Sequence, residues 1–150
     1  MQCSIEVRTT VAAPFAKTAA KFNINLFKAL APVFPQLRID RYEGQQTGHR
    51  IDLRLGLWPV WVPWRLTIAH HWDEAESWGF VDQGLVMPWP LAAWQHEHRL
   101  NALPDGQTEI VDAIVLSVKP RWLAPAMGWL VRKQMEGRQP AYRAYFCKPD

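Results

Sequence analysis

The feature that most constrains the fold is a series of six strand-like segments between residues 37 and 118. In the clearest segment, residues 51–57, apolar side chains alternate with Asp52, Arg54 and Gly56. This period of two is typical of a strand with one buried face. Every connection between segments contains Pro, Gly or Asp, as tight turns require. The pattern predicts an antiparallel sheet whose other face is covered. The segments are residues 37–43, 51–57, 61–72, 78–86, 92–100 and 108–118.

The residues on either side of this series predict one more strand and three helices. Residues 5–11 are rich in β-branched side chains and predict a strand, and helices are predicted at 15–22 and 24–30. Residues 123–146 predict a long helix with one apolar face. Pro140 lies inside it and removes one helical hydrogen bond, so we expect the helix to kink or end near Gly137. The order of elements predicts an α+β fold.

Composition excludes several classes of protein. The chain has 150 residues, of which 49% are hydrophobic and 21% charged, with a net charge of +3. These values indicate one globular domain, residues 1–150, and exclude intrinsic disorder. The longest apolar stretch, residues 55–64, contains two prolines and is too short to cross a bilayer. Glu6 and Arg8 lie where a signal peptide would be apolar. We therefore expect a soluble, cytoplasmic protein.

Several short motifs, taken together in their order and spacing, resemble a known superfamily. They are Thr10-Val11-Ala12-Ala13-Pro14, Arg41-Tyr42-Glu43-Gly44, Phe80-Val81-Asp82, Trp94-Gln95-His96-Glu97-His98 and Gly106-Gln107-Thr108, followed by Asp112 and Pro120. This set resembles the START-like (SRPBCC) superfamily, in particular its bacterial ligand-binding and polyketide cyclase/dehydratase-like branch. The resemblance implies a helix-grip fold, in which a curved antiparallel sheet of about seven strands wraps round the C-terminal helix, with two short helices after strand one. It does not imply one reaction, because a fold does not fix a function.

The resemblance also implies an apolar cavity between the sheet and the last helix, where a lipid or a polyketide-like molecule would bind. Such cavities are mostly apolar and contain a few polar groups. The expected polar members are Asp82, His96, His98 and Asp112. The expected apolar walls are Leu53, Leu55, Trp64, Leu66, Phe80, Trp94, Ile110, Ile114, Met127, Leu130, Val131 and Met135.

The four polar residues are also expected to meet on the sheet. Alternation along residues 94–100 separates His96 and His98 from the polar Gln95, Glu97 and Arg99, so the histidines are expected to face inward. The turn near residues 103–106 would bring Asp112 opposite His96 or His98. The turn near residues 87–90 would bring Asp82 near His96. A register error of one residue would reverse these faces.

Three interpretations of this His/Asp cluster follow from the residue types. It can be a satisfied hydrogen-bond network, it can orient a hydroxyl or carbonyl group of a ligand, or it can supply a general acid and base near neutral pH. His96, His98 and one carboxylate are residue types that can ligate a metal, but the sequence has no motif with zinc-site spacing. We therefore predict neither a metal nor a cofactor.

Two further functions remain as alternatives to ligand binding. One is an enzyme of the polyketide cyclase or dehydratase type that uses His96 or His98. The other is an interaction module, because residues 119–150 carry a net charge of +5 and Trp58 and Trp61 could form an exposed aromatic rim. This module would use Arg132, Lys133 and Arg138 to contact a protein or, weakly, a membrane surface. No RNA-binding motif is present, so we expect no nucleic-acid partner. We expect a monomer or a homodimer.

Overall fold

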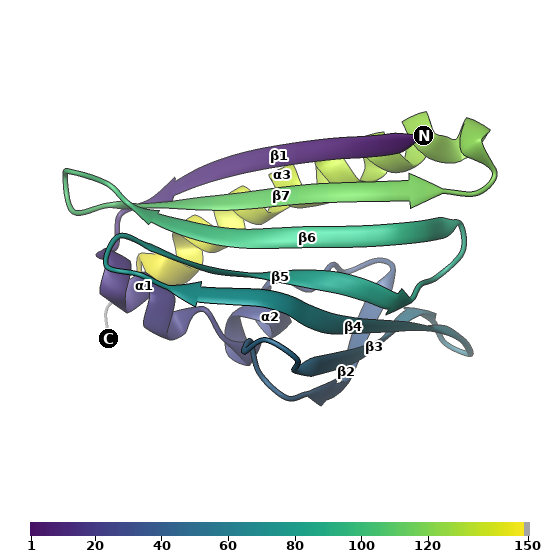
Figure 1. Cartoon of the computed structure of the whole chain (residues 1–150), viewed down its shortest axis with the longest axis horizontal. Helices are drawn as coiled ribbons and strands as arrows, with labels where there is room; N and C mark the ends of the chain where they lie inside the picture. Colours follow the sequence, from purple (N-terminus) through teal and green to yellow (C-terminus); the bar gives the residue numbers. More distant parts are fainter. Residues whose placement is uncertain (149–150) are drawn as a thin grey trace.

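The computed structural model describes residues 1–148, which form a seven-stranded antiparallel sheet curved around a long C-terminal helix (Figure 1). The strands lie in the order β1-β7-β6-β5-β4-β3-β2. The elements in chain order are β1 (Gln2–Val11), α1 (Phe15–Lys21), α2 (Ile24–Leu30), β2 (Gln36–Tyr42), β3 (Arg50–Leu57), β4 (Val60–Asp73), β5 (Ser77–Val86), β6 (Leu91–Ala102), β7 (Thr108–Val118), the 3-10 turn η1 (Arg121–Leu123) and α3 (Ala124–Phe146). None of the described helices is long and apolar enough to cross a bilayer.

This arrangement confirms the predicted helix-grip fold. The predicted helix at residues 24–30 and the predicted strand at residues 108–118 coincide with α2 and β7. Consecutive strands from β2 to β7 are neighbours in the sheet, as the short turns between them require. β1, the first strand in the chain, lies at the edge of the sheet beside β7, the last strand, and Ile5 pairs there with Ile114.

The core lies between the concave face of the sheet and one face of α3. On β6 and β7 the side chains alternate between buried and more exposed positions, which is the period of a strand with one covered face. The helix contributes Val131, Met135, Tyr142 and Phe146, all at most 5% exposed. Phe22, in the short link between α1 and α2, closes one end of this core and contacts the rings of Trp78, Phe80 and Tyr142.

The prediction that α3 could end near Gly137 is wrong. The helix continues through Pro140 to Phe146. Tyr142 and Phe146 lie beyond the proline and are buried in the core. Burial of two aromatic side chains contributes several kcal/mol, which is comparable with the cost of a proline inside a helix. Tertiary packing therefore holds the last two turns in place.

Replacing Pro140 with Ala should stabilise the protein. The proline side chain is exposed, so the change removes little packing, and it restores a backbone N–H donor to α3. We expect the free energy of unfolding to rise by about 1–3 kcal/mol. Urea unfolding followed by circular dichroism measures it as a higher midpoint at an unchanged slope. A lower midpoint would mean that the proline ring makes a packing contribution larger than its helical cost.

Candidate functional site

The strand register brings the four predicted polar residues together on the concave face of the sheet. Asp82 on β5 lies opposite His96 on β6, and His98 lies opposite Asp112 on β7. These are the juxtapositions that the hairpin geometry predicted. All four side chains face the core and are at most 5% exposed. Burial of four ionisable groups is unusual, because a charge taken out of water must be paired or hydrogen-bonded.

Each carboxylate in this cluster accepts hydrogen bonds from a histidine and from one aromatic donor. Nε2 of His98 donates to Oδ2 of Asp82 at 2.8 Å, and the indole N–H of Trp94 donates to Oδ1 at 2.9 Å. The second carboxylate, Asp112, accepts at Oδ1 from Nε2 of His96 at 2.9 Å. Its Oδ2 accepts from the hydroxyl of Tyr142, on α3, at 3.1 Å. The bonds run diagonally to the register and form two groups, which meet where the ring centroids of His96 and His98 lie 3.7 Å apart. Together the two groups join three strands and the helix.

The electrostatics of the cluster keep both carboxylates charged and His98 neutral at pH 7. Burial, with repulsion from His96, lowers the pKa of His98 from 6.5 to about 4. Burial alone would raise the pKa of Asp82 and of Asp112. The histidine hydrogen bonds and nearby positive charges outweigh that effect, lowering the pKa of Asp82 and holding that of Asp112 at about 2. Burial and the Asp112 charge raise the pKa of the Tyr142 hydroxyl well above its usual value.

Arg138 connects this cluster to the surface. Its side chain is 20% exposed, and its NH1 atom lies 3.8 Å from Oδ1 of Asp112. This NH1 atom is buried and makes no hydrogen bond to any described residue. Arg138 therefore offsets the charge of Asp112 and leaves one buried donor without a partner among residues 1–148. The sequence carries a signal for this residue, because Arg138 lies three positions after Met135 and four before Tyr142, on the apolar face of α3.

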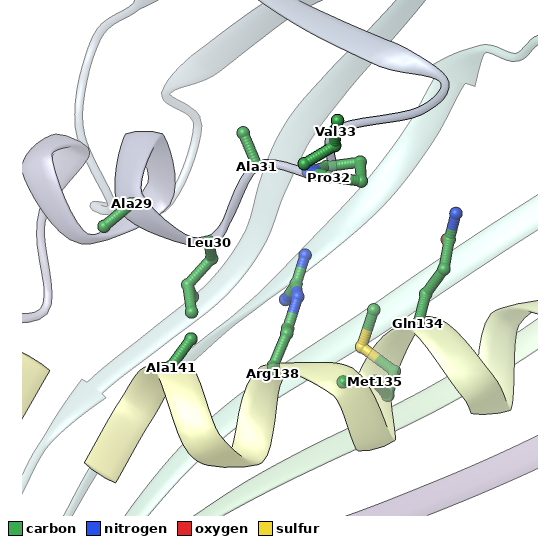
Figure 2. A pocket seen from close by; sticks show the side chains of 10 residues that line it. Ala29, Leu30, Ala31, Pro32, Val33, Gln134, Met135, Arg138 and Ala141 are labelled. Carbon is green, nitrogen blue, oxygen red and sulfur yellow. The ribbon is translucent and has the colours of Figure 1, made fainter. Parts of the chain in front are cut away.

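A pocket of about 320 Å³ lies against α3, and sequence analysis missed it. Figure 2 shows Leu30 and the connector that follows α2 on one side, with Gln134, Met135 and Arg138 of α3 directed into the space from the other. The connector contributes mostly apolar atoms from Ala31 to Val33. No local pattern in the sequence indicates this pocket, because it exists only where the connector crosses the helix.

A second space lies against the sheet and is much smaller. It has a volume of about 50 Å³ and is lined by seven apolar or aromatic residues together with Asp82. The hydroxyl of Tyr42, on its wall, is buried without a hydrogen-bonding partner in the described part of the chain, and burial raises the pKa of that hydroxyl to about 12. A space of this size can hold water but not a lipid.

The predicted wall residues divide among these spaces and the packed core. Leu53 and Leu66 line the small cavity, and Met135 lines the pocket beside α3. Leu55 lines a groove at the surface. The residues Phe80, Trp94, Ile110, Ile114 and Val131 are buried in the core, with Trp64 and Met127 partly buried against it. Leu130 was expected to be a wall, but it is 42% exposed, because the neighbouring Val131 occupies the inward face of the helix.

Metal ligation is a chemical option for part of the cluster. One ligand atom from each of Asp82, His96 and His98 lies within 4.8 Å of the others, and two imidazoles with a carboxylate are a donor set that zinc accepts. A metal would have to displace the proton shared by His98 and Asp82. The hydrogen bonds already compensate the carboxylate, so the arrangement favours a proton-based network.

Stability should fall as the pH decreases from 6.5 towards 4. In that range the unfolded chain binds a proton at His98, whereas the folded protein, with a pKa of about 4, does not. The loss should be roughly 3 kcal/mol, and the low pKa values of Asp82 and Asp112 should extend it below pH 4. Urea midpoints measured across this range test the expectation. The variant His98→Gln, which keeps a donor for Asp82, should lose much less stability between pH 6.5 and 4.

The exposed His70 provides the control for that experiment. His70→Gln should retain the pH dependence of the unmodified protein. If His98→Gln retained it as well, His98 would not be the group responsible.

Comparison with known proteins identifies the architecture. By sequence, the chain matches no protein-family model and no curated protein. By structure, it is similar to norcoclaurine synthase from Thalictrum flavum, with a TM-score of 0.70, 13% identity, and 100% of this chain and 96% of that one covered. It is similar to the Zhui aromatase/cyclase from a Streptomyces species, with a TM-score of 0.69, 16% identity, and coverage of 97% and 93%.

A START superfamily protein from Mycobacterium smegmatis is a third structural neighbour, with a TM-score of 0.66 and 13% identity over 96% of this chain and 97% of that one. The matches extend over nearly the whole of each chain. They agree with the seven-stranded sheet, the two short helices and the long last helix described above. This chain therefore has the helix-grip fold of the START-like (SRPBCC) proteins.

Proposed function

We propose that this protein binds a small, mainly apolar molecule that carries an anionic or hydrogen-bond-accepting group. The binding site is the pocket between the α2–β2 connector and α3. Its volume of about 320 Å³ is at the lower end of the range for small-molecule sites. The single observation that carries the proposal is the buried NH1 donor of Arg138, which has no hydrogen-bonding partner among residues 1–148 and belongs to a residue that lines a mostly apolar pocket.

Arg138 determines which chemical group the pocket favours. A buried guanidinium donor without a partner costs free energy, and an acceptor oxygen from a ligand removes that cost. A carboxylate, sulfonate, phenolate or carbonyl oxygen can accept this bond. Asp112 lies behind the guanidinium, 3.8 Å from NH1, and holds it in place. The apolar body of the ligand would then contact Leu30, Val33 and Met135.

Structural neighbours support an aromatic molecule as the first ligand class to test. One of them is norcoclaurine synthase in complex with dopamine and hydroxybenzaldehyde, which has a TM-score of 0.68 and 13% identity to this chain. Another is an aromatase/cyclase. A shared fold does not transfer a ligand, so these neighbours guide the choice of probe only.

Two fluorescent probes that differ by one sulfonate test the role of Arg138. Anilinonaphthalene sulfonate is anionic, and N-phenyl-1-naphthylamine is its neutral counterpart. We expect saturable binding near one probe per chain, with the anionic probe bound more tightly. Arg138→Gln should weaken binding of the anionic probe by about tenfold, because a charge-assisted hydrogen bond contributes about 1.4 kcal/mol or more. It should change binding of the neutral probe little. Equal affinities of Arg138→Gln and the unmodified protein for the anionic probe would contradict the proposal.

Gly137 allows the pocket to be filled without a clash. A side-chain carbon added at Gly137 meets no atom within 4 Å, although the residue lines the pocket. Gly137→Leu should therefore reduce the affinity for both probes by about tenfold or more while leaving the fold intact, as a leucine removes much of the volume. Gly137→Ala adds the same helical propensity with little volume, so it is the matched control and should bind normally. Normal binding by Gly137→Leu would place the ligand elsewhere.

A second candidate function is proton-transfer catalysis of the cyclase or dehydratase type by His96 or His98. The observation that favours it is the chain of contacts from the pocket through Arg138 and Asp112 to His96. Both histidines are at most 3% exposed, so a substrate would have to open the core to reach them. Turnover of an aromatic polyketide-like substrate, lost in the double variant His96→Gln/His98→Gln with its circular dichroism unchanged, would support catalysis. Retained turnover would exclude it.

A further inference from the structure

One end of the sheet carries the exposed apolar side chains. Four connectors lie there: residues 31–35 before β2, 58–59 between β3 and β4, 87–90 between β5 and β6, and 119–123 after β7. Figure 1 shows the β3–β4, β5–β6 and β7–η1 connections at the same end of the molecule, opposite the C-terminus. We call these connectors, the adjoining strand ends and the first two turns of α3 the tryptophan end.

All large hydrophobic side chains that are exposed among residues 1–148 lie at the tryptophan end. Trp58, Trp89 and Trp122 are each at least 75% exposed, and Trp129 is 63% exposed. An apolar groove of about 450 Å³ runs between Phe34 and the β3–β4 hairpin. Exposed apolar surface concentrated in this way marks a contact site. The full set is Met1, Val33, Phe34, Leu57, Trp58, Val60, Val62, Leu85, Val86, Trp89, Trp122, Trp129 and Leu130.

The charges at the tryptophan end have one sign. The four connectors contain Lys119 and Arg121, both exposed, and no carboxylate. Residues 119–135 also contain Arg132 and Lys133 and no acidic residue. Along β2 and β3 the nearest carboxylates are Asp40, which accepts from Arg54 at 2.7 Å, and Asp52, which lies 3.6 Å from Arg50.

The turns at the opposite end differ in composition from the connectors of the tryptophan end. Its turns contain Glu43, Glu74, Glu76 and Asp105. No residue at that end belongs to the set of exposed large hydrophobic side chains in the described part of the chain. The exposed large hydrophobic side chains are therefore gathered at one end of the molecule, where the connectors carry basic but no acidic side chains, while the turns at the other end carry acidic ones.

We propose that the tryptophan end docks on the surface of an anionic phospholipid bilayer. Tryptophan favours the boundary between headgroups and acyl chains, where its ring is apolar and its N–H can reach water. Lysine and arginine beside such rings are attracted to anionic headgroups. Trp58, Trp89 and Trp122 project from three separate connectors spread across the sheet, Trp129 projects from α3, and a bilayer is a partner that all of them can contact at once. Nucleic acid would require a track of cations with few aliphatic side chains.

The proposed surface differs from the one that the sequence predicted. Trp61 was expected in the exposed rim, but it is half-buried, and the guanidinium of Arg38 lies 4.2 Å from its ring centroid. Arg138 turns inward to Asp112, and Lys133 donates to Glu136 at 2.9 Å. The proposed surface instead includes the exposed side chains of Trp89, Trp122, Lys119 and Arg121. The proposal does not depend on occupancy of the pocket beside α3.

Flotation with lipid vesicles tests the proposal on the full chain. The vesicles contain phosphatidylcholine alone or with about 30% phosphatidylglycerol. We expect the protein to bind the anionic vesicles at least about tenfold more tightly than the neutral ones. The variant Trp58→Ser/Trp89→Ser/Trp122→Ser should weaken that binding by about tenfold or more. Lys119→Gln/Arg121→Gln should weaken it by about fivefold for each charge removed.

A matched control removes two charges from the other end. Arg143→Gln/Lys148→Gln has the same net charge as Lys119→Gln/Arg121→Gln, and both replaced residues are exposed near the end of α3. The control should bind anionic vesicles at least about tenfold more tightly than Lys119→Gln/Arg121→Gln binds them. Equal losses in the two variants would reduce the effect to net charge and overturn the proposal.

Three other outcomes would also overturn it. The first is that the unmodified protein does not float with anionic vesicles. The second is that the tryptophan variant floats as well as the unmodified protein. The third is that light scattering finds a dimer which the tryptophan variant converts to a monomer, because the tryptophan end would then be an interface between two copies of this chain.

Discussion

Two carboxylates held inside the core are the constraint on which the rest of the structure depends. Asp82 and Asp112 are at most 5% exposed, and an uncompensated charge at such a depth costs several kcal/mol. The protein meets that cost with two imidazoles, an indole, a phenol and a guanidinium. These groups belong to Trp94, His96, His98, Arg138 and Tyr142.

The same network fixes how the strands pair. Trp94, His96 and His98 all come from β6, and their acceptors lie on β5 and β7. A slip of one residue in either pairing would turn a carboxylate or its donors to the other face of the sheet. Tyr142 then ties α3 to the same carboxylate that β6 holds. The polar cluster therefore specifies register, whereas the apolar core around it supplies most of the stability.

Local rules predicted much of this from the sequence. Hairpin lengths and the two-residue period of a strand sufficed to bring Asp82, His96, His98 and Asp112 together, since both act over short distances along the chain. Continuation of α3 past Pro140 was not predictable from the sequence. The free-energy cost of the proline is offset by the burial of Tyr142 and Phe146, and that burial depends on tertiary contacts. The extent of the cavity between sheet and helix was not predictable for a related reason. Ring packing by Phe22, Trp78 and Phe80 fills the space between sheet and helix, and side-chain packing of this kind is not encoded in any local pattern.

Arg138 divides one positive charge between two partners. From one side its guanidinium faces the carboxylate of Asp112, and from the other it borders the pocket beside α3. An anion bound in that pocket would draw on the same charge, so occupancy of the pocket and protonation of Asp112 are thermodynamically linked. Protonating Asp112 would leave the guanidinium to the ligand, and a bound anion would in turn raise the pKa of Asp112. If the pocket binds an anion as proposed, the buried network would respond to what lies in the pocket through the same residue that neutralises the core.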